Sequence, residues 1–512
     1  MNAVPRLRPN YAGPALLSYG FRPFFLFGTT YAALAMLVWL PFFHGELTVA
    51  TAFAPSDWHV HEMLFGYLAA IIAGFLLTAV PNWTGRLPLQ GLRLLILVAA
   101  WAAGRIAVTL SAWLGEVAAA AIDLSFLFLV AAAVAREIIA GRNWRNLKVL
   151  LPLVVLGGAN VVFHVEAHAS GHADYGIRLA IAAVVMLIML IGGRVIPSFT
   201  RNWLVRESPG RLPVPFAQFD AVALAVGAAA LALWIVGPAA RLTALVLLAA
   251  GALHAIRLAR WAGERTLRDR LVLVLHVGYI FIPLGFCLMG SAALGLLPPS
   301  AGLHAWMTGA AGMMTLAVMT RASLGHTGHA LQASRLTQAL YAAVLAAAIT
   351  RVIGDGGAGL EQPASAPCWR CMDCRIRRVC RPVWADAAAP SRECTRGYRM
   401  KQRLTILAAL AILTIGTGER TLIGTTPAHA QSVQRGLTFA RVNCGRCHSL
   451  DKYSESSLPV APPFRILHRR YPVESLEEAL GEGIMTGHPS MPQFRLDPGQ
   501  IADLIAFLKS LE

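Results

Sequence analysis

Charged side chains are scarce in this sequence, and acidic ones are scarcer than basic ones. Only 14% of its 512 residues are charged, and 56% are hydrophobic, whereas soluble domains carry about 25% charged residues. This deficit excludes an ordinary soluble protein. Long apolar runs recur between Phe21 and Val352, and about 20 such residues cross a bilayer as a helix. We therefore expect an all-α, polytopic transmembrane bundle surrounded by the lipid bilayer.

Basic residues are scarce in every second loop between these runs, and one of these loops has only Arg241. Residues 41–61, 114–115, 168–175 and 296–303 hold no Lys or Arg, whereas the intervening loops hold many. Cytoplasmic loops carry the excess of Lys and Arg, so the pattern predicts an N-terminus inside the cell. It also accounts for much of the net charge of +17 without nucleic acid as a partner. The eleven predicted spans are 19–40, 62–80, 92–113, 116–136, 149–166, 176–195, 216–236, 241–260, 271–294, 302–320 and 335–353.

Several histidines stand at the predicted outer ends of these spans. His59 and His61 precede the second span, His164 and His168 leave the fifth, and His304 enters the tenth. Residues four apart share one face of a helix, so His164 and His168 can hold one metal ion. His59 and His61 face the same way only if the chain is extended. Imidazole suits iron, copper and zinc, while simple contact with water is the competing interpretation for each histidine taken alone.

Three motifs and one further stretch resemble the NnrS family over residues 14–353. The motifs are SYGFRPFFLFG, DWHVHEMLFGYLAAIIAGFLLTAVPNWTGR and HAWMTGAAGMMTLAVMTRASLGHTG, and the stretch is GGRVIPSFTRNWL. Members of that family are polytopic membrane proteins that bind haem and copper and are associated with nitric oxide resistance and denitrification. The resemblance thus implies a haem and a copper site, with nitric oxide as a ligand. Its candidate ligands are His59 and His61 in WHVHEM, and His304 and His326 in the last motif, with the metal of each left open.

The stretch NCGRCHSL near the end of the chain carries a second kind of site. Cys444, Cys447 and His448 form the C-x-x-C-H pattern that attaches c-type haem covalently. Met491 in GHPSMPQF is the predicted second axial ligand, with His488 as its rival, and a thioether opposite histidine raises the reduction potential. The pattern therefore predicts a haem c that carries single electrons.

An amphipathic segment closes the chain after this motif, with apolar residues from Ile501 to Leu511 on one stripe. The haem pattern, the methionine and the closing helix resemble a small α-helical class I cytochrome c domain over residues 431–512. That resemblance implies a periplasmic location and redox partner proteins in the periplasm.

The chain between the two domains is unusual. Residues 400–430 have a basic start, a short apolar core and an A-x-A ending, as a secretory signal peptide does. Residues 354–399 lack periodicity and an apolar span. We interpret them as the product of a shifted reading frame, with a natural disordered linker as the alternative. Their cysteines are spaced nearly as in an iron–sulfur site, which is the third interpretation; they are Cys368, Cys371, Cys374 and Cys380.

These features together predict a multi-pass protein of the bacterial inner membrane with a periplasmic cytochrome domain. Its predicted function is to bind haem and copper in a response to nitric oxide, and to transfer electrons through the cytochrome. Two alternatives remain open. One is a transporter whose histidines are structural or carry protons, and the other is a quinol- or cytochrome-linked reductase.

Overall fold

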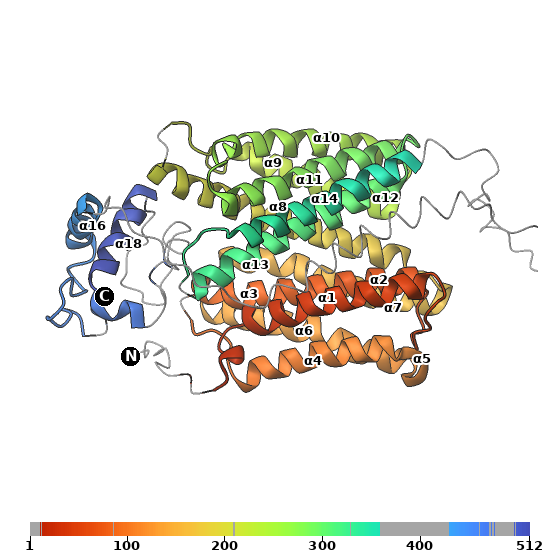
Figure 1. Ribbon diagram of the computed structural model, residues 1–512, viewed down its shortest axis with the longest axis horizontal. Coiled ribbons are helices and arrows are strands. Elements are labelled where there is room, and N and C mark those ends of the chain that lie inside the picture. Colours follow the sequence, from red (N-terminus) through yellow and green to blue (C-terminus); the bar gives the residue numbers. More distant parts are fainter. Residues whose placement is uncertain are drawn as a thin grey trace, which may run out of the picture.

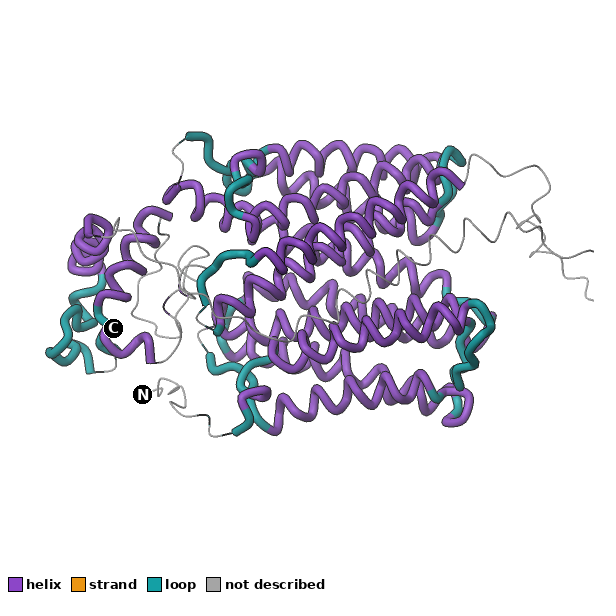
Figure 2. The backbone as a smooth tube through the Cα atoms, in the orientation of Figure 1, coloured by secondary structure: helices purple, strands orange, loops and turns teal. Residues whose placement is uncertain are grey.

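The computed structural model describes most of the chain on either side of a long gap. The described residues are 11, 13–358 without 85, 208, 209 and 328, then 430–469 without 460, and finally 473, 476, 496 and 498–512. Within them the regular elements are all helices, as Figure 2 shows, so the predicted all-α class is confirmed for this part of the chain. The predictions for Met491, for Cys368 to Cys380 and for the signal-like segment up to residue 429 fall outside it.

The long helices follow the predicted spans closely. The first half holds α1 (Phe21–Phe43), α2 (Pro55–His61), η2 (Glu62–Leu68), α3 (Ala69–Thr84), α4 (Leu92–Thr109), α5 (Ser111–Leu114), α6 (Glu116–Ala140), α7 (Leu150–Ser170) and α8 (Asp174–Glu207). The second half holds α9 (Gln218–Val236), α10 (Arg241–Ala259), α11 (Arg270–Ala293), α12 (Pro299–His304), η5 (Ala305–Gly312), α13 (Met313–His326) and α14 (Arg335–Ala358). Four short 3-10 turns are η1 (Ala15–Leu17), η3 (Trp144–Val149), η4 (Gly263–Arg265) and η7 (Phe464–Arg469).

Ten of these helical stretches are long and apolar enough to cross a membrane, among the described residues. The tenth predicted span, 302–320, falls on the consecutive elements α12, η5 and α13 and is not among these ten helices. Large apolar side chains point out of the bundle, including Leu92, Ile106, Val117 and Leu151. In water such a surface would be costly, whereas lipid tails cover it without penalty. The protein is therefore a multi-pass membrane protein, although the count of eleven spans is not established.

Two of the membrane segments are interrupted in the same way. In each, a short α-helix begins at a proline and ends at a histidine, and a π-helix follows: α2 ends at His61 before η2, and α12 ends at His304 before η5. Segments of π-helix are rare and occur frequently at functional sites. Figure 1 places α2 and α12 at the same end of the bundle.

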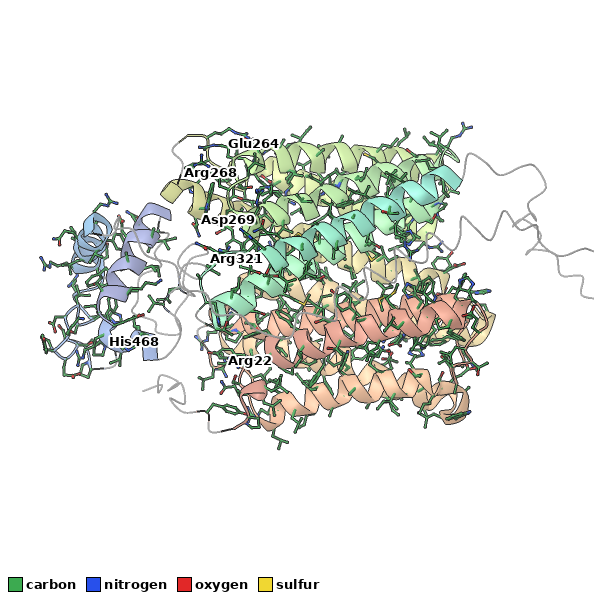
Figure 3. The ribbon with its side chains drawn as sticks, viewed as in Figure 1. Arg22, Glu264, Arg268, Asp269, Arg321 and His468 are labelled. Carbon is green, nitrogen blue, oxygen red and sulfur yellow. The ribbon has the colours of Figure 1, made fainter. Side chains whose placement is uncertain are left out.

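The helices lie roughly along one axis in two groups, one built from α1 to α7 and the other from α9 to α12 and α14 (Figure 1). Helix α8 connects them, since it contacts α7 on one side and α9 and α11 on the other, and α13 contacts α1, α3, α11 and α14. Arg22 and Arg321 lie at the same end of the bundle in Figure 3, together with Arg268. That is the end predicted to be cytoplasmic, and α2, α5 and α12 mark the opposite, outer end.

A buried charge cluster ties the second group of helices together near the inner end. Arg257 on α10 donates from Nε to Oδ1 of Asp220 on α9 at 3.0 Å, and from Nη1 to the Tyr279 hydroxyl on α11 at 3.0 Å. Nη1 also donates to the Met189 carbonyl of α8 at 3.1 Å, and His254 Nδ1 lies 3.0 Å from the same hydroxyl. Because its charges and hydrogen bonds are matched internally, this cluster is a structural clasp.

The C-terminal unit has a core of its own. Helices α16 (Ala430–Asn443) and α18 (Pro498–Ser510) pack against each other, and Phe464 and Leu467 of η7 complete the apolar cluster with Ile501 and Leu504. The predicted apolar stripe of the closing helix therefore faces this core. Arg435 on α16 also binds Asp503 on α18 through two hydrogen bonds, of 2.7 and 3.1 Å.

The contact between α16 and α18 requires a glycine. A Cβ atom placed on Gly436 would overlap the carbonyl oxygen of Asp503, which belongs to rigid backbone. We expect Gly436→Ala to force the two helices apart and destabilise this unit by about 1–3 kcal/mol. Limited proteolysis of the full-length protein should cut the unit faster, whereas the control Thr438→Ala, at an exposed position on α16, should leave it resistant. Equal cleavage rates would contradict this account.

The C-terminal unit lies beside the end of the bundle at which α1 begins (Figure 1), and α18 contacts α8. The positive-inside pattern predicts that this end is cytoplasmic. The periplasmic location of the unit stays a prediction. Residues 359–429, which connect the two parts, lie outside the described residues.

Candidate metal centre

Three potential metal ligands meet near the outer end of the first helix group. The ligand atoms of His61, Asp123 and His164 all lie within 4.8 Å of one another, and all three residues are buried. They come from the end of α2, the middle of α6 and the last turns of α7. Two imidazoles and one carboxylate are a donor set that zinc, copper and iron accept. These residues therefore fit a transition-metal ion, by chemistry and by spacing.

Asp123 is the centre of this group. Its Oδ2 lies 3.0 Å from His164 Nε2, 3.2 Å from His61 Nε2 and 2.7 Å from Asn160 Nδ2, which donates to it. The Asp123 side chain is 0% exposed. An ionised carboxylate is stable in such a place only with positive or polar partners around it. Asp123 has four such partners, because Arg105 joins the three side chains just named.

Glu62 and Arg105 extend the group into a charge network. Arg105 Nη1 donates to Glu62 Oε2 at 2.7 Å and Nη2 donates to Asp123 Oδ1, so one guanidinium bridges both carboxylates. Glu62 also contacts His61 Nδ1 at 3.1 Å and accepts a hydrogen bond from the Tyr31 hydroxyl. Both ring nitrogens of His61 thus face acceptor oxygens. Arg105 fixes the carboxylates that orient the imidazole, as outer partners do around metal ligands in general.

Two glycines make room for this network. A Cβ atom on Gly66 would lie 2.9 Å from Glu62 Oε2 and 3.0 Å from Arg105 Nη1, and one on Gly104 would lie 3.0 Å from Asp123 Oδ1. Gly66 belongs to the π-helix η2, and Trp101 donates from Nε1 to its carbonyl at 2.9 Å. The irregular turn and the two glycines together let charged groups approach inside the bundle.

Sequence reasoning missed Glu62, Arg105, Asp123 and Asn160. A signal was present, because Arg105 and Asp123 interrupt otherwise apolar spans, and ionisable residues inside a membrane are costly and mark functional sites. The prediction of ligands from histidine spacing did not include these carboxylate, guanidinium and amide side chains. His59 and His61 are both helical, in α2, so they point in different directions.

His168 does not join the buried group, although it follows His164 by one helical turn on α7. Its side chain is 68% exposed and contacts Glu116 at the start of α6. The structure therefore separates the two histidines that the spacing predicted to share one metal ion. His164 turns inward to Asp123, while His168 remains at the surface.

His59 belongs to a second place, with His304 of α12 within electrostatic range. The His59 ring stacks on Trp39 of α1 with centroids 4.1 Å apart, and its Nδ1 is buried with no hydrogen-bond partner. The ring is buried, and Arg351 of α14 lies within electrostatic range of it, as His304 does. A buried imidazole nitrogen without a partner is costly, and a metal ion or haem iron would satisfy it. These residues therefore fit a second ligand site.

His326 lies far from both places along the helix axis. It ends α13, and its ring stacks on Phe21 at 5.4 Å and lies 5.8 Å from the Tyr19 ring. Helix α1 begins beside it, at the inner end of the bundle. The candidate ligands at the outer end are thus His59, His61, His164 and His304, and His326 stands apart from them.

The C-x-x-C-H pattern of the C-terminal unit forms a single helical turn. The backbone N–H groups of Cys447 and His448 both donate to the Cys444 carbonyl, at 3.1 and 3.0 Å. Neither cysteine is in a disulfide. His448 Nδ1 donates to the Pro462 carbonyl at 2.8 Å, which places the lone pair on Nε2, the nitrogen that would bind a haem iron. The geometry fits attachment of haem c, since both thiols and the imidazole project from one turn.

Burial, together with the neighbouring Cys447, raises the pKa of the Cys444 thiol to about 11. Only the thiolate attacks disulfides and oxidants readily. At neutral pH the Cys444 thiol therefore stays protonated and slow to oxidise. Arg441, His448 and Asp451 line an open cavity of about 440 Å³ beside the motif.

The fold and the buried charged group define a multi-pass membrane protein with a candidate metal centre at its outer end. The chain belongs to the NnrS family, whose model, described as NnrS protein, matches residues 15–371. The match covers all the membrane helices and extends beyond the predicted boundary at residue 353. No curated protein and no solved structure matches the chain.

Proposed function

We propose that this protein binds haem and copper in the membrane as part of a response to nitric oxide in denitrifying bacteria. The observation that carries the proposal is the convergence of His61, Asp123 and His164 in a family associated with that response. In this proposal, His61 and His164 hold copper beside Asp123, and His59 with His304 holds haem. A reduced metal held at either place would supply a binding position for nitric oxide.

The chain's own residues then have distinct tasks. Asp123 neutralises the metal charge and aligns the two imidazoles through Oδ2. Arg105 holds Asp123 and Glu62 in place, and Asn160 donates to Asp123 from the side. Phe53, Phe65 and Phe163 surround the His61 ring and exclude water from it.

We further propose that the C-terminal unit is a c-type cytochrome that transfers single electrons. Cys444 and Cys447 would hold the porphyrin by thioether bonds, and His448 with Met491 would bind the iron. Attachment of haem c would require this unit to face the periplasm. In Figure 1 the unit lies beside the end of the bundle at which α1 begins, which is the end predicted to be cytoplasmic. The bacterial inner membrane is the proposed location of the whole protein, with periplasmic redox proteins as partners.

The experiment uses full-length protein with Cys444→Ala and Cys447→Ala, which removes only the covalent haem. We expect the purified variant to retain copper and a haem absorption band, and to show a spectral shift with nitric oxide. A colourless, copper-free variant would reject the haem–copper proposal and favour the transporter interpretation. A periplasm-specific reporter fused after Glu512 should be active in the intact protein, and inactivity would reject the periplasmic cytochrome.

A further inference from the structure

Two imidazole–carboxylate pairs flank the outer end of α7, outside the buried metal group. His168, in the last turn of α7, contacts Glu116, where α6 begins. Gly171 then turns the chain with φ at +78°, and His172 follows with Nδ1 at 3.6 Å from Oδ2 of Asp57, in the first turn of α2. Asp57 is the first residue of the motif DWHVHEM, but the ligands predicted from the sequence do not include Asp57, Glu116 or His172.

One carboxylate oxygen of Asp57 lacks the hydrogen bond that its burial calls for. The residue is 7% exposed, and its Oδ2 is buried and accepts no hydrogen bond. The 3.6 Å separation from His172 is too long for a hydrogen bond. Ligand atoms on one tetrahedral metal ion, each about 2.0–2.2 Å from it, lie roughly 3.3–3.6 Å apart. The gap between this oxygen and this nitrogen therefore has the size that a bridging metal ion needs.

The two histidines are reachable from water. The side chains of His168 and His172 are 68% and 57% exposed, whereas Asp57 is almost covered. The loops at this end lack Lys and Arg between residues 41 and 61, at 114–115 and at 168–175. A cation approaching from outside therefore meets imidazole and carboxylate groups without basic residues from those loops.

The same helix leads from this surface to the buried group. His164 lies one turn before His168 on α7 and is 9% exposed, so it borders both the surface and the interior. Its Nε2 lies 3.0 Å from Asp123 Oδ2. The surface pairs offer two donors each and the buried group offers three, so a cation is held more weakly outside than inside.

We propose that Asp57 and His172, with His168 and Glu116 beside them, form an entry site for a divalent transition-metal cation on its way to His61, Asp123 and His164. The site captures the ion from water by one imidazole and one carboxylate, and His164 receives it. This inference rests on the proposed metal occupancy of the buried group. No bond other than metal–ligand bonds changes, and the oxidation state of the ion stays constant during the transfer.

The test follows the uptake of Cu²⁺ by copper-stripped full-length protein in detergent, by stopped-flow quenching of tryptophan fluorescence. We expect Asp57→Asn and the double variant His168→Ala/His172→Ala to load at least 10-fold more slowly at low Cu²⁺. The final copper content per chain should equal that of the unchanged protein. His44→Ala, which removes another exposed histidine at the same end, is the matched control and should load at the normal rate.

The outcomes separate the two proposals. If Asp57→Asn and His168→Ala/His172→Ala both take up Cu²⁺ at the normal rate, the entry site is overturned, while the proposed buried centre is unaffected. If the unchanged protein binds Cu²⁺ only weakly at the surface, and the double variant His61→Ala/His164→Ala binds it equally, the buried centre is rejected instead. Asp57→Asn keeps the side-chain shape, so a normal melting temperature with slow loading supports the entry site. Slow loading by His44→Ala as well would overturn it.

Discussion

Exchange of Arg105 for methionine is expected to destabilise the first helix group by about 3–5 kcal/mol, because it leaves two buried carboxylates without their shared cation. Glu62 and Asp123 are both 0% exposed, and Arg105 is 5% exposed. Methionine retains similar length and an apolar stem, so the lost charge and hydrogen bonds dominate over a packing defect. The measurement is thermal unfolding of the purified full-length protein in detergent.

The control for Arg105 is a second arginine–glutamate pair of similar geometry. Arg86 Nε lies 2.6 Å from Glu137 Oε2, but the Arg86 side chain is 36% exposed. Since exposed ion pairs contribute about 0–1 kcal/mol, Arg86→Met should shift the melting temperature far less. Equal shifts for the two variants would show that the buried network does not stabilise the bundle as described. Adding Glu62→Gln to Arg105→Met should recover part of the loss.

Replacement of Asp123 by asparagine should lower the affinity of the proposed metal centre by at least about 100-fold. Outer partners of metal ligands alone contribute about 10–100-fold in affinity, and Asp123 is both a ligand candidate and the acceptor for His61, His164 and Asn160. Asparagine keeps the shape but removes the charge. Copper content after dialysis against graded chelator concentrations measures the change.

Glu137→Gln is the matched control for Asp123→Asn. Glu137 lies on the same helix, α6, but binds Arg86 and Arg136 toward its other end. It should leave the chelator series unchanged. If Asp123→Asn retains copper as firmly as the unchanged protein, the three-residue centre is wrong, even if copper is bound elsewhere.

The membrane architecture was predictable because it depends on local composition. Apolar runs and loops without basic residues follow from the cost of placing charge and bare backbone in lipid. Each span can therefore be predicted from its own residues alone. The turn of Cys444 to His448 was predictable for a similar reason, since its geometry follows from a short motif. In both cases the residues that determine the structure are close together in the sequence.

The metal centre was not predictable to the same depth, because its members lie far apart in the chain. Asp123 and Asn160 come from spans that show no shared motif, and only packing of α6 on α7 brings them together. The pattern WHVHEM drew attention to two imidazoles, yet the adjacent Glu62 proved to be the residue that connects His61 to Arg105. Spacing within a segment cannot report which neighbouring helix a side chain faces.

The π-helices η2 and η5 have a consequence for how this protein can vary. Such a segment accommodates one more residue than the α-helical turn it replaces, so removing a single residue from η2 would restore regular winding. The half of the helix beyond it would then rotate by about 100° relative to His61. These two short segments therefore set the angular phase between the imidazoles at the outer rim and the packing surfaces deeper in the bilayer.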